Sequence, residues 1–201
     1  MPILSLTERF LRLEEDLQAT PPAFTTNSDL PFAIFRYDPT LPDESEWEVR
    51  GRIQSLATRL GQKTGKGVHL LSLASLYWKA IEDSEGIETL FQGEREFGFP
   101  EAEEQVHTYL SEPMWKPLPD LLATELAAYE PTRDLVFLTR AGVFAPHSYR
   151  VSMLLEQLMG RILVPTVLFY PGVWTGSLNY LGLHHQDEPM GSYRIKIYGG
   201  E

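Results

Sequence analysis

The sequence contains no cysteine among its 201 residues. This absence excludes disulfide bonds, thiolate nucleophiles and zinc–thiolate sites, and it suits a reducing compartment. No stretch approaches the roughly 20 apolar residues that a membrane-spanning helix needs. The N-terminal residues MPILSLTERFLRLEEDL are charged and amphipathic, unlike the unbroken apolar segment of a signal peptide. We therefore expect a cytoplasmic protein without a membrane span.

Positive charge is scarce, with 17 Lys and Arg against 28 Asp and Glu and a formal net charge of -11. The deficit lies in residues 82–130, which carry two basic and thirteen acidic side chains. This stretch would repel nucleic-acid phosphates and attract a basic protein surface. Glu101, Glu103 and Glu104 are therefore candidates for an acidic partner surface. The alternative is a solvated helical face that aids solubility.

Residues 61–67 read GQKTGKG, which resembles a phosphate-binding loop. Such a loop needs Gly-x-x-x-x-Gly-Lys followed by Ser or Thr, placed between a strand and a helix. Here the spacing is one residue short, and Gly67 stands where the magnesium-binding hydroxyl should be. The order is also reversed, because a helical pattern precedes the glycines and a strand pattern follows them. We interpret the segment as a helix-to-strand turn.

Apolar periodicity indicates alternating helices and strands in the first part of the chain. Ser5 and Glu8 have the spacing of a capping box, with apolar residues at helical spacing behind them. Short apolar runs bounded by turn residues are typical of buried strands. The expected elements are a helix that ends before Pro21, strands over 31–37 and 66–73, a helix from Asp43 or Ser45 to Leu60, and a helix over 73–83.

The acidic stretch is predicted to be a helical tract from Ile87 to about Tyr129. Glycine and proline interrupt it at Gly98, Pro100, Pro113 and Pro117. Beyond it the patterns predict a strand over 134–144, a helix opened by Pro146, an apolar strand over 164–171 and a half-wet edge strand over 193–199.

Strands that alternate with helices imply right-handed crossovers and a parallel sheet. We therefore expect an α/β fold of three layers, with a mainly parallel sheet flanked by helices. We expect residues 1–201 to form a single domain, with residues 82–130 as an acidic helical insertion. Ligands of such sheets bind outside the carboxyl ends of the strands, which are here the loops at Tyr37-Asp38, Leu73, Arg140-Ala141 and Tyr170-Pro171.

No residue pattern predicts a catalytic, cofactor-binding or metal site. His184 and His185 with Asp187 and Glu188 are the nearest approach to a metal cluster, but adjacent strand residues point to opposite faces, so a turn is favoured. His147 at a helix start is expected to be structural. No Gly-x-Ser-x-Gly nucleophile motif is present.

Four arginines lie in or beside the expected strand ends: Arg36, Arg50, Arg140 and Arg150. Their forked side chains could bind carboxylates or phosphates of a ligand. They could equally pair with Asp38, Glu46, Glu48 or Glu156 and fasten strands to helices. The sequence leaves both readings open.

Three segments, taken together, resemble the BrxB family of bacteriophage exclusion (BREX) systems. They are FAIFRYDPTLPDESEWEVRGRIQSLATRL, LVFLTRAGVFAPHSYRVSMLLEQLMGR and VPTVLFYPGVWTGSLNYLGL, followed by a closing YRIKIY. The motif positions are Tyr37, Pro39, Glu48 and Arg50, then Leu138, Thr139, Gly142 and Arg150, then Phe169, Tyr170, Pro171 and Gly172. The candidate interaction or structural residues are Tyr37, Asp38, Glu48, Arg50, Arg140, Arg150, Tyr170, Pro171 and Gly172.

The resemblance implies a small cytoplasmic bacterial protein of an anti-phage defence island, which distinguishes self from phage DNA through a methyltransferase. It also implies no established enzymatic motif and a direct partner in PglZ, the alkaline-phosphatase-like protein of the same system. The acidic stretch 82–130 lies outside the resembling segments.

Three functions follow as hypotheses. The first is a non-catalytic adaptor that binds PglZ or another BREX component through the acidic helices, an exposed Trp115 region or the strand-end arginines. The second is a degenerate P-loop-like or cryptic nucleotide-binding or enzymatic module built on Asp38, Arg50, Arg140 and Arg150. The third is a nucleic-acid-binding subunit, which the sequence pI of 4.9 disfavours. We favour the adaptor, without a cofactor.

Overall fold

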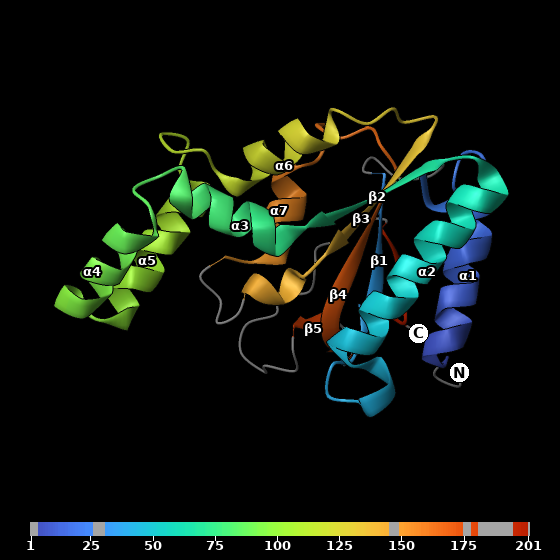
Figure 1. The fold of residues 1–201 in the computed structure, drawn as a ribbon, viewed down its shortest axis with the longest axis horizontal. Coiled ribbons are helices and arrows are strands. Elements are labelled where there is room, and N and C mark those ends of the chain that lie inside the picture. Colours follow the sequence, from blue (N-terminus) through green and yellow to red (C-terminus); the bar gives the residue numbers. More distant parts are fainter. Residues whose placement is uncertain (1–3, 26–30, 145–148, 175–177, 181–194, 201) are drawn as a thin grey trace. The chain divides into compact units, whose positions relative to one another are not determined.

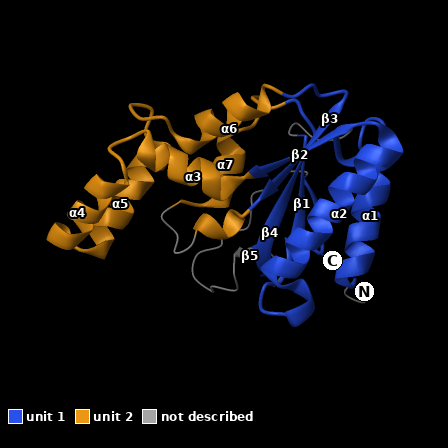
Figure 2. Ribbon diagram, in the orientation of Figure 1, with its two compact units in different colours: residues 1–71, 129–139, 163–201 blue, residues 72–128, 140–162 orange. Residues whose placement is uncertain are grey.

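A computed structural model describes residues 4–25, 31–144, 149–174, 178–180 and 195–200. The chain divides into two compact units (Figure 2). Unit 1 comprises residues 1–71, 129–139 and 163–201, and unit 2 comprises residues 72–128 and 140–162. The acidic stretch 82–130 lies in unit 2 up to residue 128, together with the helices that flank it in sequence.

Unit 1 is built around a parallel sheet in the order β2-β3-β4-β1-β6. At the β2–β3 edge, the Gly67 amide donates to the Arg133 carbonyl and the Thr139 hydroxyl donates to the Leu71 carbonyl, so both strands start at the same end. The short β5 pairs antiparallel with β4. The strands are β1 Phe32–Tyr37, β2 Gly67–Ser72, β3 Asp134–Thr139, β4 Thr166–Trp174, β5 Leu178–Tyr180 and β6 Lys196–Tyr198.

Two helices of unit 1, α1 (Leu6–Gln18) and α2 (Glu46–Thr64), pack side by side over one face of the sheet (Figure 1). Their apolar stripes meet the alternate residues Ala33, Phe35 and Tyr37 of β1. The rings of Phe10 and Phe35 lie 4.4 Å apart between centroids. Residues of the opposite sheet face are also buried, among them Phe32, Ile34, Leu138 and Leu168.

The described part of unit 2 consists mainly of helices. α3 is Leu73–Glu82, α4 is Ile87–Phe97, α5 is Phe99–Ser111, α6 is Leu118–Leu126 and α7 is Val151–Gln157. α4 and α5 form a helical hairpin that turns at Gly98, whose φ of 94° is in the left-handed region that favours glycine. α3, α5 and α6 contact one another. Pro100 does not interrupt a helix, because it lies in the first turn of α5, where no backbone N–H is needed.

The α/β class and the parallel sheet flanked by helices are confirmed. The Ser5–Glu8 capping box is present, and Ser45 rather than Asp43 caps α2, accepting from the Glu48 amide. β3 is shorter than the strand predicted over 134–144, because Arg140 leaves the extended region with a φ of 64° and a 3-10 turn follows. α7 starts at Val151, whereas Pro146, predicted to open it, lies outside the described residues. No described helix is long and apolar enough to cross a lipid bilayer.

The segment GQKTGKG is a helix-to-strand turn, as predicted. α2 runs four residues beyond Leu60, and Gly65 ends it in the left-handed conformation at a φ of 71°. β2 begins two residues later. The Lys66 ammonium donates to the carbonyls of Leu17 and Ala19 at 3.2 and 2.9 Å. It therefore supplies donors to the C-terminal end of α1, where helix carbonyls lack intrahelical partners.

β6 lies at the sheet edge, as predicted. The side of this strand that carries Lys196 and Tyr198 was expected to face water, but it contacts α1 instead. Lys196 and Tyr198, on the side expected to be wet, both bind the Asp16 carboxylate of α1. Tyr198 is buried. Burial raises the pKa of its hydroxyl, as do the hydrogen bond to Asp16 and the charge of that carboxylate.

Candidate functional site

The carboxyl ends of β1 and β4 lie side by side in the sheet. From β1 the chain crosses to β2 at one edge of the sheet, and from β4 it crosses past β1 to β6 at the other edge. Adjacent strands whose connections leave in opposite directions form the point at which α/β sheets usually bind ligands. We call the side chains and loop gathered here the strand-end cluster: Arg9, Arg36, Asp38, Glu44, Gly172 and Gly199.

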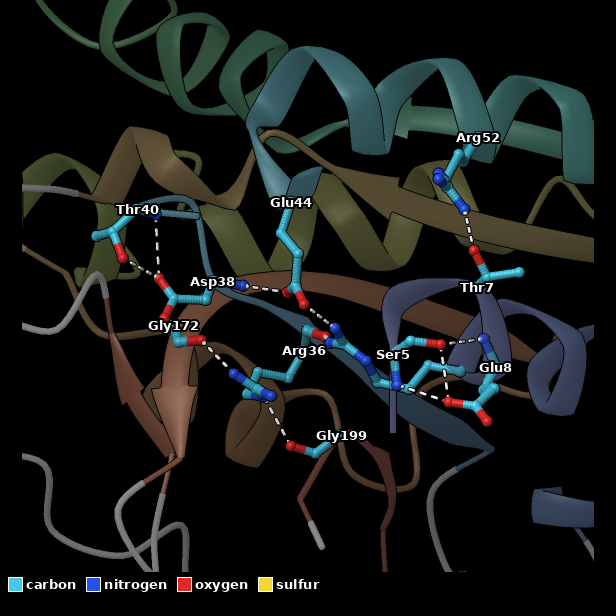
Figure 3. Close-up of polar contacts among 11 residues, drawn as sticks. Ser5, Thr7, Glu8, Arg36, Asp38, Thr40, Glu44, Arg52, Gly172 and Gly199 are labelled. Carbon is cyan, nitrogen blue, oxygen red and sulfur yellow. Dashed lines mark hydrogen bonds and ion pairs between the residues drawn. The ribbon is translucent and has the colours of Figure 1, made fainter. Parts of the chain in front are cut away.

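Arg36, near the end of β1, joins the three neighbouring strands of the cluster (Figure 3). Its Nε donates to the carbonyl of Gly199 just beyond β6 at 2.6 Å, and its Nη1 donates to the carbonyl of Gly172 in β4 at 3.3 Å. Burial lowers the pKa of this guanidinium, and the neighbouring Arg9 charge lowers it further, while Glu44 and Asp38 oppose the shift. The two acids thus offset the two arginines in formal charge.

Arg9 of α1 lies beneath this strand end and is only 1% exposed. Its Nη1 donates to the Arg36 carbonyl at 2.5 Å, and its Nη2 forms an ion pair with Glu44. The guanidinium carbon lies 5.8 Å from the centre of the Phe35 ring, within the range of a cation–π contact. Arg9 Nε is buried and has no hydrogen-bond partner among the described residues.

The loop that follows β1 directs its backbone amides at the protein's own oxygens. The Asp38 amide donates to Glu44 Oε2 at 2.8 Å, and the Thr40 amide and hydroxyl donate to Asp38 Oδ1 (Figure 3). The Leu41 amide donates to the Asp38 carbonyl. Pro39 and Pro42 have no N–H to offer. A phosphate-binding loop would present such amides to its anion. Here the amides of Asp38, Thr40 and Leu41 already donate to oxygens of the protein, so this loop is a closed turn.

The other candidate residues of unit 1 are distributed around the cluster. The Tyr37 hydroxyl donates to Glu46, while Tyr170, Pro171 and Gly172 are buried in β4. Glu48 does not pair with Arg50; it binds Arg52 one helical turn later at 2.9 Å. Arg50 is exposed and has no ion pair with a described residue. Of the four candidate arginines, Arg36 alone joins the strand-end cluster, and its hydrogen bonds go to main-chain carbonyls.

The remaining candidates lie in unit 2. Arg140, directly after β3, and Arg150, the residue before α7, are both exposed. Glu101 and Glu104 are exposed on α5, and Glu103 is half-buried. Trp115 is also half-buried rather than exposed as expected, with its ring edge-on to Tyr109 at 5.3 Å. The structure thus divides the candidates between the two units.

No group of metal-ligating side chains occurs within the described part of the chain. His147, His184, His185, Asp187 and Glu188 lie outside the described residues.

Arg9 is the central residue that sequence reasoning missed. A signal was present, because Arg9 lies within the stripe formed by Leu6, Phe10 and Leu13 on α1. A charge within an apolar stripe is costly to bury unless an opposite charge or a hydrogen-bond acceptor meets it. The position of Arg9 therefore predicts an acidic partner elsewhere in the sequence. Helix periodicity does not show that this partner is Glu44.

A family model described as BREX protein BrxB matches residues 69–196. The match covers the second and third of the segments that resemble this family, β2 to the start of β6, and the acidic stretch. The first segment, with β1 and most of α2, precedes it. No curated protein and no solved structure matches the chain. Because the matched residues make up more than half of the sequence, the chain belongs to the BrxB family of BREX anti-phage defence components.

Proposed function

We propose that this BREX component is a non-catalytic adaptor that binds the PglZ-type alkaline-phosphatase-like protein of the same system. The observation that carries the proposal is the strand-end cluster. At the place where an α/β sheet ordinarily binds a ligand, Arg36 binds two main-chain carbonyls and Arg9 binds Glu44. These polar groups are engaged in holding strands and helices together.

The same cluster argues against the nucleotide-binding alternative. A nucleotide site at this strand end would need to free Arg36 from its carbonyls or open the turn formed by Asp38 and Thr40. It would also place phosphates beside the Glu44 carboxylate, which is buried and already paired. Freeing Arg36 or opening the turn would break contacts within unit 1, and the Glu44 carboxylate would repel the phosphates.

The charge distribution supports a protein partner over a nucleic acid. The thirteen acidic and two basic side chains of residues 82–130 oppose a phosphate backbone and favour a basic protein surface. A direct role on DNA would predict a steep fall of affinity with salt for the isolated protein. We propose instead that contact with DNA is left to other components of the system.

The test is size-exclusion chromatography with light scattering on the protein mixed with its cognate PglZ. We expect a stable complex that is lost when Glu101, Glu103 and Glu104 are all changed to Lys. The matched control changes the exposed Glu15, Glu125 and Glu156 to Lys, which alters the net charge equally at other positions.

A complex that survives reversal of the α5 glutamates would move the contact to another surface. Absence of a complex with the wild-type protein would reject PglZ as the direct partner. Screening of nucleotides by thermal shift would then be the next measurement.

A further inference from the structure

The α4–α5 hairpin, residues 87–111, exposes three phenylalanine side chains. Phe91, Phe97 and Phe99 are 44%, 66% and 53% exposed. Phe97 and Phe99 flank the turn at Gly98, and Phe91 lies six residues before Phe97 on α4. Together with Glu88, Glu94 and Glu101 we call this surface the aromatic–acidic face.

The apolar side of α4 is only partly covered by the rest of unit 2. Ile87, Leu90, Phe91 and Phe97 share one side of the helix because they follow its period. Among them Leu90 is buried, Ile87 is half-buried and the two phenylalanines are exposed. α4 packs mainly on α5, and Figure 1 shows the two helices side by side. A helix that forms an apolar side and leaves much of it in water has surface available for a partner.

The charge on the hairpin identifies the chemistry of that partner. Residues 87–111 carry six glutamates and one arginine, Arg95. None of these glutamates forms an ion pair with any residue that the structure describes. A second copy of this face would bring like charges together at close range, which is unfavourable. A basic surface would neutralise them.

We propose that the aromatic–acidic face is a docking site for a basic, amphipathic segment of a protein partner. The phenylalanine side chains contact the apolar side of that segment, and the glutamates contact its lysines or arginines. A solvated helical face accounts for the glutamates but not for three exposed aromatic rings within nine residues. The inference rests on the proposed adaptor function and specifies the contact surface and the partner chemistry.

The first measurement is isothermal titration calorimetry of cognate PglZ against three proteins. They are the wild type, the variant with Phe91, Phe97 and Phe99 changed to Ser, and Trp47→Ser as the matched control. Trp47 is 81% exposed at the start of α2 in unit 1. Exposed aromatic residues at a contact often dominate affinity, so the triple variant should weaken binding by about tenfold or more, while Trp47→Ser has little effect.

The second measurement does not depend on PglZ. Fluorescence titration uses a synthetic amphipathic helical peptide of leucine and lysine, with a leucine–glutamate peptide of the same pattern as control. We expect the lysine peptide to bind the wild type at least about tenfold more tightly than it binds the triple variant, and more tightly than the glutamate peptide binds. Circular dichroism confirms folding, and Phe97→Ser alone replaces the triple variant if that variant is misfolded.

The two measurements separate the two proposals. Binding of the lysine peptide without binding of PglZ would reject the adaptor's partner and retain the docking face. Binding of PglZ that the phenylalanine changes leave intact, or that Trp47→Ser abolishes instead, would overturn the docking face and retain the adaptor. Equal binding of both peptides to the wild type, or no peptide binding, would also overturn the docking face, as would self-association through the phenylalanines.

Discussion

Arg9 on α1 and Glu44 before α2 form an ion pair whose side chains are 1% and 8% exposed. The pair connects two helices to the end of β1, because Arg9 also donates to the Arg36 carbonyl and Glu44 also accepts from the Asp38 amide. Removing both charges from water is costly, and the hydrogen bonds around them offset that cost. The pair therefore matters for the local arrangement of unit 1 more than for net stability.

Changing Arg9 to Met should destabilise the protein by about 3 to 5 kcal/mol, because Glu44 stays buried without its cation. Changing Glu44 to Gln should have a similar effect on Arg9. The double variant should be more stable than the sum of the two losses predicts, since it leaves neither charge unpaired. Urea unfolding of the four proteins gives the coupling directly. Strictly additive losses would show that the two side chains act independently.

Gly199 tests how tightly the cluster is packed. Its φ is 90°, and an added Cβ would lie 3.0 Å from Arg9 Cδ and 3.2 Å from Arg36 Nε. Gly199→Ala should therefore cost about 1 to 3 kcal/mol through backbone strain and displacement of the arginines. The control is Gly51→Ala in α2, where a Cβ meets nothing within 4 Å; it should stabilise by about 0.5 to 1 kcal/mol. Thermal unfolding of both variants measures these changes. Equal changes in stability would contradict close packing around Gly199.

Glu14 makes a contribution to the free energy of unfolding that depends on pH. This buried α1 carboxylate accepts from Arg59 at 2.7 and 3.0 Å and from Lys63 at 2.7 Å, both on α2. The Arg59 hydrogen bonds lower its pKa below 4.5, opposed by burial and assisted by Lys63. A lowered pKa in the folded state adds stability above the unfolded value, and this stability is lost as the pH falls through the folded value.

Glu14→Gln should therefore cost about 1 to 2 kcal/mol at neutral pH, since both cations are half exposed and can be solvated after the change. The difference between wild type and variant should shrink as the pH falls below 4.5. Urea unfolding at stepped pH values measures it. If the difference in the free energy of unfolding between wild type and variant stays constant as the pH falls, Glu14 is not a source of the pH dependence.

A substitution of Lys66 distinguishes a structural role of this lysine from a role in phosphate binding. Its ammonium binds the carbonyls of Leu17 and Ala19, so Lys66→Met should reduce the free energy of unfolding by about 0.5 to 1.5 kcal/mol. Burial lowers the pKa of Lys66. Magnesium and ATP should leave the melting temperature of the wild type and of the variant unchanged. A rise for the wild type that disappears in Lys66→Met would restore GQKTGKG as a nucleotide site.

Features that depend on near neighbours in the chain could be predicted from local residue patterns. The capping box at Ser5, the helix over the apolar stripe that follows it and the turn at Gly65 all follow from spacings of a few residues. The α/β class follows because alternating strands and helices leave few ways to bury both sets of apolar faces. Family membership was also visible, because its segments extend over much of the chain.

Contacts between residues far apart in the sequence could not be predicted in this way. Glu44, Glu46 and Glu48 are equivalent acids at the start of a helix by local rules, yet Glu44 pairs with Arg9, Glu46 accepts from Tyr37 and Glu48 pairs with Arg52. The apolar stripe of α4 likewise does not reveal that Leu90 is buried while Phe97 is exposed. These outcomes depend on strand order and helix packing, whose contacts join residues far apart in sequence, and no local pattern encodes such contacts.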